Sequence, residues 1–402
     1  MSTKSAPKKS TTRRGEPSTQ SPVAIARGAS AVTREQLVAA SAGRCEFAGC
    51  NKLLYEHELT KKDGNFGEAA HIVAFSESGP RGDIDRPTTV EINSADNLMM
   101  LCAADHKLID DRPDEYSVEM LREWKRIHEE RIRLVTGLGP DLRTTVVQLK
   151  TMIAGQAVGI PAPQIYKAVA PRYPTDTKGV VIDLTNIPGE GDDFYSVASR
   201  RIRRDVAHLF AEGMEVHETR HISLFALAPI PVLMLLGSAL GNKVQVDLYQ
   251  RHRDTEDWLW KREGVPARHA FRTMCVGSDP TRVALLMSLS GCVEPGNLPS
   301  TIDDTFTIYE LALESPEPSL TYLRRRADLE DFENVYRQAF AQIRAKHPGL
   351  VDLHVFPAIP APIAVACGRE LLPKIDPVLL VYDFDKVQGY RLRQRVNEYA
   401  ND

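Results

Sequence analysis

Two stretches between Glu68 and Asp111 organise the chain: E-A-A-H-I-V-A-F (residues 68–75) and N-S-A-D-N-L-M-M-L-C-A-A-D-H-K-L-I-D-D (residues 93–111). His71 lies in an apolar run that predicts a strand, and an imidazole with an ordinary pKa near ~6.5 can accept a proton from water at neutral pH. His106 and Asp110 are four residues apart. On a helix they would share one face, as two ligands of one metal ion must.

These residue types together suit metal-assisted hydrolysis of a phosphodiester. Such a reaction needs a base for water, a divalent cation for the charge on the phosphate, and a group that orients the base. We expect His71 to be the base and His106 and Asp110 to bind the cation. Asn97, just before the apolar run, can accept the ring N–H of His71 and fix its tautomer. Mixed nitrogen and oxygen ligands suit Mg²⁺ or Mn²⁺, and Ni²⁺ less selectively.

Three cysteines frame the same stretch: Cys45, Cys50 and Cys102. With one carboxylate or imidazole they could complete a tetrahedral structural zinc site. The spacing leaves the fourth ligand open. If Asp105 closes the site, His106 is free for the catalytic ion; if His106 closes it, that ion keeps only Asp110 and water.

The residues from Arg44 to about Leu134 resemble the HNH endonucleases of the ββα-metal, treble-clef kind. The motifs that carry the likeness are C-x4-C, A-H-I, N-L-x-x-L-C-x-x-x-H-K-L-I-D and S-V-E-M-L-R-E-W-K-R-I-H-E. The resemblance implies an α+β, zinc-containing domain that cuts DNA. Ala70 stands where many members carry an Asp or His metal ligand, and Asp105 where a Cys or His is usual. Because Ala70 removes one usual metal ligand, a second interpretation is a non-enzymatic nucleotide-sensing scaffold with a structural zinc module.

Composition indicates a globular chain rather than a membrane or disulfide-rich one. A length of 402 residues predicts two or three domains. Six scattered cysteines without a secretory leader indicate reduced thiols in a cytosol. The longest apolar run, Ile222–Leu240, is interrupted by Pro229 and Pro231, which argues against a membrane span. A net charge of -4, and an acidic excess between Arg34 and Arg133, argue against tight DNA binding by one copy.

The chain divides into a tail, two domains and a linker. Residues 1–30 are rich in Lys, Arg, Ser and Pro, which predicts a disordered basic tail. We expect a nuclease domain over 31–137, a linker over 138–164 and a second domain over 165–402. In the nuclease domain Ser117 begins an amphipathic helix whose apolar positions should pack on the metal-binding core: Leu121, Trp124, Ile127 and Ile132.

From Lys178 onward strands alternate with helices, which predicts an α/β layer with a largely parallel sheet. A shift of 131 residues aligns Pro229 with Pro360 and Gly237 with Gly368. An internal duplication of this period, over about 175–275 and 280–402, implies two similar halves in pseudo-twofold contact. The strand 283–289 would then take the place of the opening strand 179–184.

Ligands of such sheets bind beyond the carboxyl ends of the strands, so two facing halves would share a cleft there. A nearly twofold ligand such as a cyclic dinucleotide would fit, with aromatic faces for its bases and cations for its phosphates. The candidate lining residues are Thr185, Pro229, Ile230, Pro231, Tyr249, Gln250, Arg251, Trp258, Trp260, Ser290, Gly291, Pro357, Ala358 and Pro360.

The run H-I-S-L-F-A-L-A-P-I-P-V-L-M-L-L-G-S-A-L, followed by Y-Q-R-H-R and W-L-W, resembles the SAVED domain, a fused pair of CARF-like halves that senses cyclic oligonucleotides. With the front domain, the architecture is similar to HNH-SAVED effectors of CBASS antiphage defence. This resemblance implies a double-strand DNA endonuclease that is silent until a cGAMP-like cyclic dinucleotide, made by a partner CD-NTase synthase, drives it into a homo-oligomer. The alternative is a restriction-type HNH endonuclease whose C-terminal domain reads modified or foreign DNA, which the arginines within 200–204 and 324–326 keep open.

Overall fold

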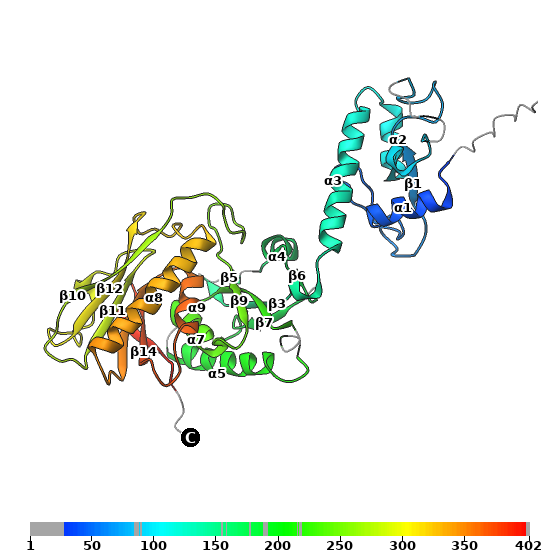
Figure 1. Cartoon of the computed structure of the whole chain (residues 1–402). Coiled ribbons are helices and arrows are strands. Elements are labelled where there is room, and N and C mark those ends of the chain that lie inside the picture. The colour runs from blue at the N-terminus through cyan, green and yellow to red at the C-terminus, as the bar shows by residue number, and fades with distance from the viewer. Residues whose placement is uncertain are drawn as a thin grey trace, which may run out of the picture. The chain divides into compact units, whose positions relative to one another are not determined.

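The chain folds as two compact units, Met1–Gly137 and Leu138–Asp402. The computed structural model describes residues 28–83, 88, 91–153, 156, 157, 159–176, 178–187, 192–214, 216 and 219–398. Positions 1–27 of the predicted basic tail lie outside the described residues. Each unit has its own helices, strands and hydrophobic core (Figure 1).

The first unit is built on an antiparallel pair of strands followed by a helix. β1 (Gly67–His71) pairs with β2 (Leu98–Cys102), and α2 (Ala103–Asp111) follows β2 without a loop. All of residues 98–101 are buried, and they form a core with Ala70 of β1 and Ile109 of α2. This core fixes α2 against the strand pair, in the ββα order that the motifs predict.

Two further helices flank this arrangement, α1 (Ala31–Ser41) and α3 (Val118–Thr136). Ser117 is the N-cap of α3, as predicted, and its hydroxyl accepts a hydrogen bond from the N–H of Met120. The buried face of α3 differs from our prediction, because Ile127 is 52% exposed while Lys125 and His128 are buried. Both polar residues have partners there: Lys125 pairs with Glu129, and the His128 ring donates to the Ser41 carbonyl.

The second unit contains two sheets that are largely parallel, as predicted. The first has five strands: β3 (Arg143–Lys150), β6 (Tyr173–Pro174), β7 (Val180–Asp183), β8 (His221–Leu227) and β9 (Gln245–Leu248). All their pairings are parallel. A short hairpin of β4 (Met152–Ile153) and β5 (Gln156–Ala157) and the helix α4 (Ala162–Val169) lie between β3 and β6 along the chain.

The second sheet has six strands: β10 (Arg268–Cys275), β11 (Val283–Ser288), β12 (Thr307–Ser315), β13 (Asp352–Ala358), β14 (Val378–Asp385) and β15 (Gly389–Val396). Their order is β10-β12-β11-β13-β14-β15, and only the two edge strands pair antiparallel. Besides α4, the unit contains the helices α5 (Asp192–Leu209), α7 (Ile230–Leu240), α8 (Arg326–Lys346) and α9 (Ala361–Arg369).

The four main strands of each half follow the same order. β3 lies between β7 and β8, with β9 outside β8; likewise β11 lies between β12 and β13, with β14 outside β13. The counterpart of β11 is therefore β3, and our alignment of 283–289 with 179–184 was wrong. The reason is that β3 lies in the stretch 138–164, where we expected a linker.

We did not predict β3 from the sequence because polar residues interrupt its apolar run. Thr144, Thr145 and Gln148 are buried within it beside Val147 and Leu149. The Thr144 hydroxyl has partners on the neighbouring strand β8, since it lies 2.8 Å from the His221 ring and 2.9 Å from the Ser223 hydroxyl. Buried polar groups with such partners are compatible with a central strand, although they hide it from a hydrophobicity pattern.

The two halves meet where α7 and α9 pack against each other (Figure 1). A Cβ added to Gly237 would lie 2.0 Å from the carbonyl oxygen of Val365, and one added to Gly368 would lie 1.9 Å from that of Met234. Both pairs correspond under the shift of 131 residues, so the contact is symmetric. Although α7 is strongly apolar, no helix within the described ranges is long and apolar enough to cross a lipid bilayer.

Candidate nuclease and ligand sites

His71 lies at the end of β1, where the chain leaves the strand pair. Its neighbour Ala70 is fully buried, whereas His71 is only partly buried. The ring atom Nε2 is 2.9 Å from Oδ1 of Asn93. With the amide oxygen as acceptor, Nε2 carries the proton and Nδ1 keeps a free lone pair.

The structure places Asn97 differently from our prediction. Its amide is buried and bonds to backbone: Oδ1 accepts from the N–H of Val73, and Nδ2 donates to the carbonyls of Val73 and Ile92. Asn97 thus holds the chain that follows His71, and Asn93 is the residue that contacts the ring. The sequence did not mark Asn93, because an asparagine in a polar loop is most often a turn residue.

His106 lies between two carboxylates. Its Nδ1 is 2.5 Å from Oε2 of Glu68, and its Nε2 is 3.3 Å from Oδ2 of Asp110, one turn along α2. The hydrogen bond to Asp110, reinforced by Glu68, raises the pKa of His106 although burial opposes it. Burial would raise the pKa of Asp110, but His106 and Arg81 outweigh it and lower that pKa. Sequence reasoning missed Glu68, since one acidic residue on a strand is usually a solvated one.

Arg81 holds β1 and α2 together beside His106 and Asp110. Its side chain is 1% exposed, and it donates to the carbonyls of Ile72 and Ile109 as well as to Oδ1 of Asp110 at 3.0 Å. The first carbonyl follows His71 and the second precedes Asp110. One guanidinium therefore ties the end of β1 to the last turn of α2.

The three cysteines and Asp105 converge on one point. Their ligand atoms all lie within 4.8 Å of one another, and Oδ2 of Asp105 is 3.2 Å from Sγ of Cys45 and 3.0 Å from Sγ of Cys102. A tetrahedral ion with Zn–S bonds of ~2.3 Å needs an edge of about 3.8 Å. The donor set fits zinc, and it is Asp105 rather than His106 that completes it. Burial raises the pKa of the Cys45 thiol, so zinc must displace its proton.

In the second unit a cavity of about 420 Å³ opens at the carboxyl ends of the strands. Its lining residues are Leu227, Ile230, Gln250, Arg251, Arg253, Glu256, Ser290, Leu320, Ile359, Pro360 and Ala361. They come from both halves: Leu227 ends β8, Leu320 lies in the loop after β12, and the others follow β8, β9, β11 and β13. Ile230 and Ala361, equivalent in the repeat, are the first residues of α7 and α9. Helix N-termini carry partial positive charge and suit anions such as phosphate.

Five of the fourteen predicted lining residues border this cavity: Ile230, Gln250, Arg251, Ser290 and Pro360. The aromatic candidates do not. Tyr249 is stacked on Phe225 at 4.5 Å between ring centroids, and Trp258 packs edge-on against the same ring at 5.4 Å; both are buried core residues. Trp260 donates its indole N–H to the Leu248 carbonyl.

The other predicted residues also lie outside the described lining of this cavity: Thr185, Pro229, Pro231, Gly291, Pro357 and Ala358. Pro231 is buried within α7, while Thr185 bonds to the carboxylate of Asp183. Arg253 and Glu256 were missed although they adjoin the predicted Arg251. Leu320 had no signal, because it reaches the cavity from a loop far along the chain.

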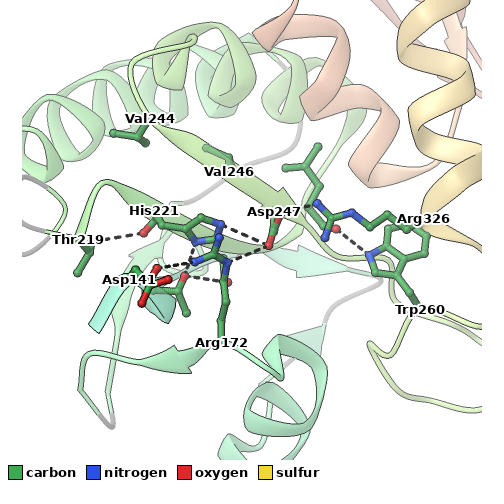
Figure 2. Close-up of polar contacts among 12 residues, drawn as sticks. Asp141, Arg172, Thr219, His221, Val244, Val246, Asp247, Trp260 and Arg326 are labelled. Atoms are coloured by element: carbon green, nitrogen blue, oxygen red, sulfur yellow. Dashed lines mark hydrogen bonds and ion pairs between the residues drawn. The ribbon is translucent and has the colours of Figure 1, made fainter. Parts of the chain in front are cut away.

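An ionic cluster around the buried carboxylate of Asp247 holds the strand that leads into the cavity. Figure 2 shows Arg172, His221 and Arg326 around the carboxylate of Asp247 on β9. Arg326 donates to Oδ1 at 2.6 Å, while His221 Nε2 and Arg172 Nε lie 3.3 Å and 3.6 Å from Oδ2. Burial raises the pKa of Asp247, but His221 and Arg326 lower it to about 2. Because Arg326 begins α8, the cluster joins the two halves beside the cavity.

Fold and sites define a nuclease-type metal unit joined to an α/β ligand-binding unit. Two protein families match the sequence: one described as HNH endonuclease, over residues 45–112, and one described as SMODS-associated and fused to various effectors sensor domain (SAVED), over residues 202–392. The protein is therefore an HNH endonuclease domain fused to a SAVED sensor domain. No curated protein matches the chain.

Among solved structures, the chain is similar to SAVED/CARF-domain containing Cap4 receptors. The Acinetobacter baumannii receptor with the cyclic trinucleotide 3'3'3'-cAAA is 11% identical, with a TM-score of 0.43 over 73% of this chain and 62% of that one. The Moraxella osloensis receptor is 12% identical, with a TM-score of 0.39 over 78% and 71%. The chain thus spans less than two thirds of the length of the Acinetobacter receptor.

Proposed function

We propose that this protein is a metal-dependent double-strand DNA endonuclease that a cyclic dinucleotide switches on, acting in the bacterial cytoplasm as a CBASS antiphage effector. The observation that carries the nuclease part is the ββα unit, in which β1 presents a partly exposed His71 and α2 presents His106 and Asp110. The sensing part rests on the cavity that both halves of the second unit line.

In this proposal His71 is the general base. Asn93 holds Nε2–H, which leaves Nδ1 to take a proton from the attacking water. Arg81 and Asn97 hold the backbone that follows the base, through the carbonyl of Ile72 and the peptide groups of Val73. These bonds would keep the ring in one orientation while water approaches from the solvent side.

His106 and Asp110 would hold the catalytic Mg²⁺ or Mn²⁺, with Ni²⁺ as a further fit. When bound, the ion supplies positive charge to the phosphate and to the departing 3′ oxygen. Two carboxylates already face the two ring nitrogens of His106. A single ion can take only one of those nitrogens, so the carboxylate at the other would orient the ring.

Zinc at Cys45, Cys50, Cys102 and Asp105 would be structural. The four residues come from the loop after α1, the end of β2 and the first turn of α2. An ion bound there would cross-link the segments that position His106, and it leaves no open position for substrate.

The ligand would bridge the two halves of the sensor unit. Ile230 and Ala361 present equivalent helix starts to one cavity, an arrangement that suits a ligand with two equivalent phosphates. A volume of about 420 Å³ lies in the range of ~300–1,000 Å³ typical of small-molecule sites. A partner CD-NTase synthase would supply the cyclic dinucleotide, and binding would assemble a homo-oligomer. Assembly would add up phosphate contacts that one acidic nuclease domain lacks.

The test is plasmid cleavage by the full chain with Mg²⁺ or Mn²⁺ and a panel of cyclic di- and trinucleotides. We expect cutting only with one of these ligands and none by His71→Ala. His57→Ala is the matched control, because His57 is a histidine of the same unit that lies outside the proposed catalytic set; its ring contacts Thr60 and Phe66. Cutting by His71→Ala at the rate of the control would refute the base. Equal cutting with and without every ligand would refute the gate and favour the restriction-type alternative.

A further inference from the structure

A groove lies between α5 and β15, with a volume of about 440 Å³. Its lining residues are Asp192, Ser196, Ser199, Arg200, Arg203, Leu392, Arg393, Gln394, Arg395 and Glu398. None of them lines the cavity at the strand ends. The groove is therefore separate from the proposed cyclic-nucleotide site.

Four arginines face this groove, and they differ in their partners. Arg393 pairs with Asp192 at 2.7 Å, and Arg395 pairs with Asp352 at 3.2 Å and with Glu398, which also lines the groove, at 3.1 Å. Arg200 and Arg203 are exposed and form no ion pair within the described part of the chain. Two guanidinium groups, less than one helical turn apart, are thus left without an anion.

The remaining arginines of the same helix serve as an internal comparison. Arg201 and Arg204 both turn to Asp205, at 2.5 Å and 2.9 Å, and neither lines the groove. The four arginines of 200–204 are therefore not one undifferentiated basic patch. Arg201 and Arg204 share the carboxylate of Asp205 on the same helix, whereas Arg200 and Arg203 are presented to an anion from outside.

We propose that this groove binds the phosphodiester backbone of duplex DNA. A guanidinium presents paired N–H donors that match phosphate oxygens, and the hydroxyl of Ser196 adds a donor beside them. The lining includes no aromatic ring and one apolar side chain, Leu392, so it has no surface on which a base could stack. The groove therefore recognises phosphates and not bases, and its binding is independent of sequence.

Phosphate binding by this groove would supply DNA affinity that the nuclease domain lacks. Acidic residues outnumber basic ones between Arg34 and Arg133, which disfavours DNA binding by that domain. Arg81 cannot help, because its guanidinium is buried. A phosphate contact on the sensor unit would add affinity without adding base specificity. It goes beyond the proposed catalysis, since it concerns binding alone.

The test measures binding of fluorescent duplex DNA by anisotropy, across a salt series and without added divalent cation. The full chain is compared with the double variants R200Q/R203Q and R201Q/R204Q, which change the net charge equally. We expect the first to weaken binding and to reduce the slope of log K against log[salt] by about 0.9 for each phosphate that the variant no longer binds. The second should keep the slope of the parent chain.

Two outcomes would overturn the proposal. One is an unchanged slope for R200Q/R203Q, or the same loss in both double variants, which would mean a general charge effect. The other is unchanged DNA affinity with a smaller oligomer in light scattering, which would make the groove a contact between copies. Because cleavage is not the readout, failure here is distinct from failure of His71 as the base.

Discussion

Replacing Gly237 with alanine tests whether the two halves of the sensor unit meet backbone to backbone. The added Cβ would lie 2.0 Å from the carbonyl oxygen of Val365 and 3.0 Å from the N–H of Arg369. Ordinary contact begins at 3.4 Å, so α7 and α9 must separate by more than 1 Å. Neither contact atom can rotate away, because both belong to the backbone of α9.

The cost can be worked from this displacement. Overpacking a core typically costs about 1–3 kcal/mol, and a clash between two helix backbones belongs at the upper end. A gap of ~1 Å also forfeits up to about half of each dispersion contact along the interface. Alanine returns about 1 kcal/mol through its better helix propensity. We therefore expect Gly237→Ala to lower the free energy of unfolding by at least about 2 kcal/mol.

The assay is urea unfolding of the full chain, followed through the transition of the sensor unit. Gly296→Ala is the control, because a Cβ there meets nothing within 4 Å. Equal stability of the two variants would refute the backbone contact. The double variant with Gly368→Ala adds a second check: its cost should be less than the sum of the single costs, since one separation of the helices relieves both clashes.

Three further predictions concern single side chains. Arg81→Leu leaves the buried carbonyls of Ile72 and Ile109 unpaired and leaves Asp110 with His106 as its remaining partner. It should destabilise the nuclease unit by about 3–5 kcal/mol in chemical denaturation, and a loss below ~1 kcal/mol would contradict the role of Arg81. The pKa of Asp247 is lowered to about 2, so its contribution, present above pH ~4, is lost as the pH falls toward 2. Asp247→Asn should accordingly cost about 2 kcal/mol at pH 6 and only about 0.4 kcal/mol at pH 2, and a pH-independent difference would count against this linkage. Asp105→Ala should lower the zinc content of the purified protein, measured by plasma mass spectrometry, and full retention would exclude Asp105 as a ligand.

Local spacing explains why much of the nuclease unit could be predicted. His106 and Asp110 meet because one helical turn separates them, and Cys102 meets Asp105 because α2 begins between them. Such contacts follow from periodicity alone. Glu68 reaches the site because β1 pairs with β2, and Asn93 reaches it from a loop. A glutamate on a strand or an asparagine in a loop is most often a solvated residue, so the sequence did not mark either of them.

The sensor unit was harder to predict where tertiary partners decide burial. The polar residues of β3 are tolerated because His221 and Ser223 satisfy them from β8, and no local pattern announces that partner. Trp258 has the chemistry of a base-stacking platform, yet Phe225 covers it. The repeat itself was visible, since prolines and glycines recur at one spacing wherever a turn or a close helix contact requires them.

The helix contact and the cavity together limit how a ligand could act on the sensor unit. α7 and α9 begin at the cavity and touch at Gly237 and Gly368, so their separation is already at its minimum. The loop after β9 is different, because it lines the cavity with charged side chains and is tied to the second half by the ion pair of Asp254 with Arg324. A ligand that moves this loop acts on the start of α8 without disturbing the helix crossing. The response to binding should therefore appear first in the 250–256 loop and at Arg326, and hydrogen exchange of the loop amides should slow on ligand addition while that of α7 stays unchanged.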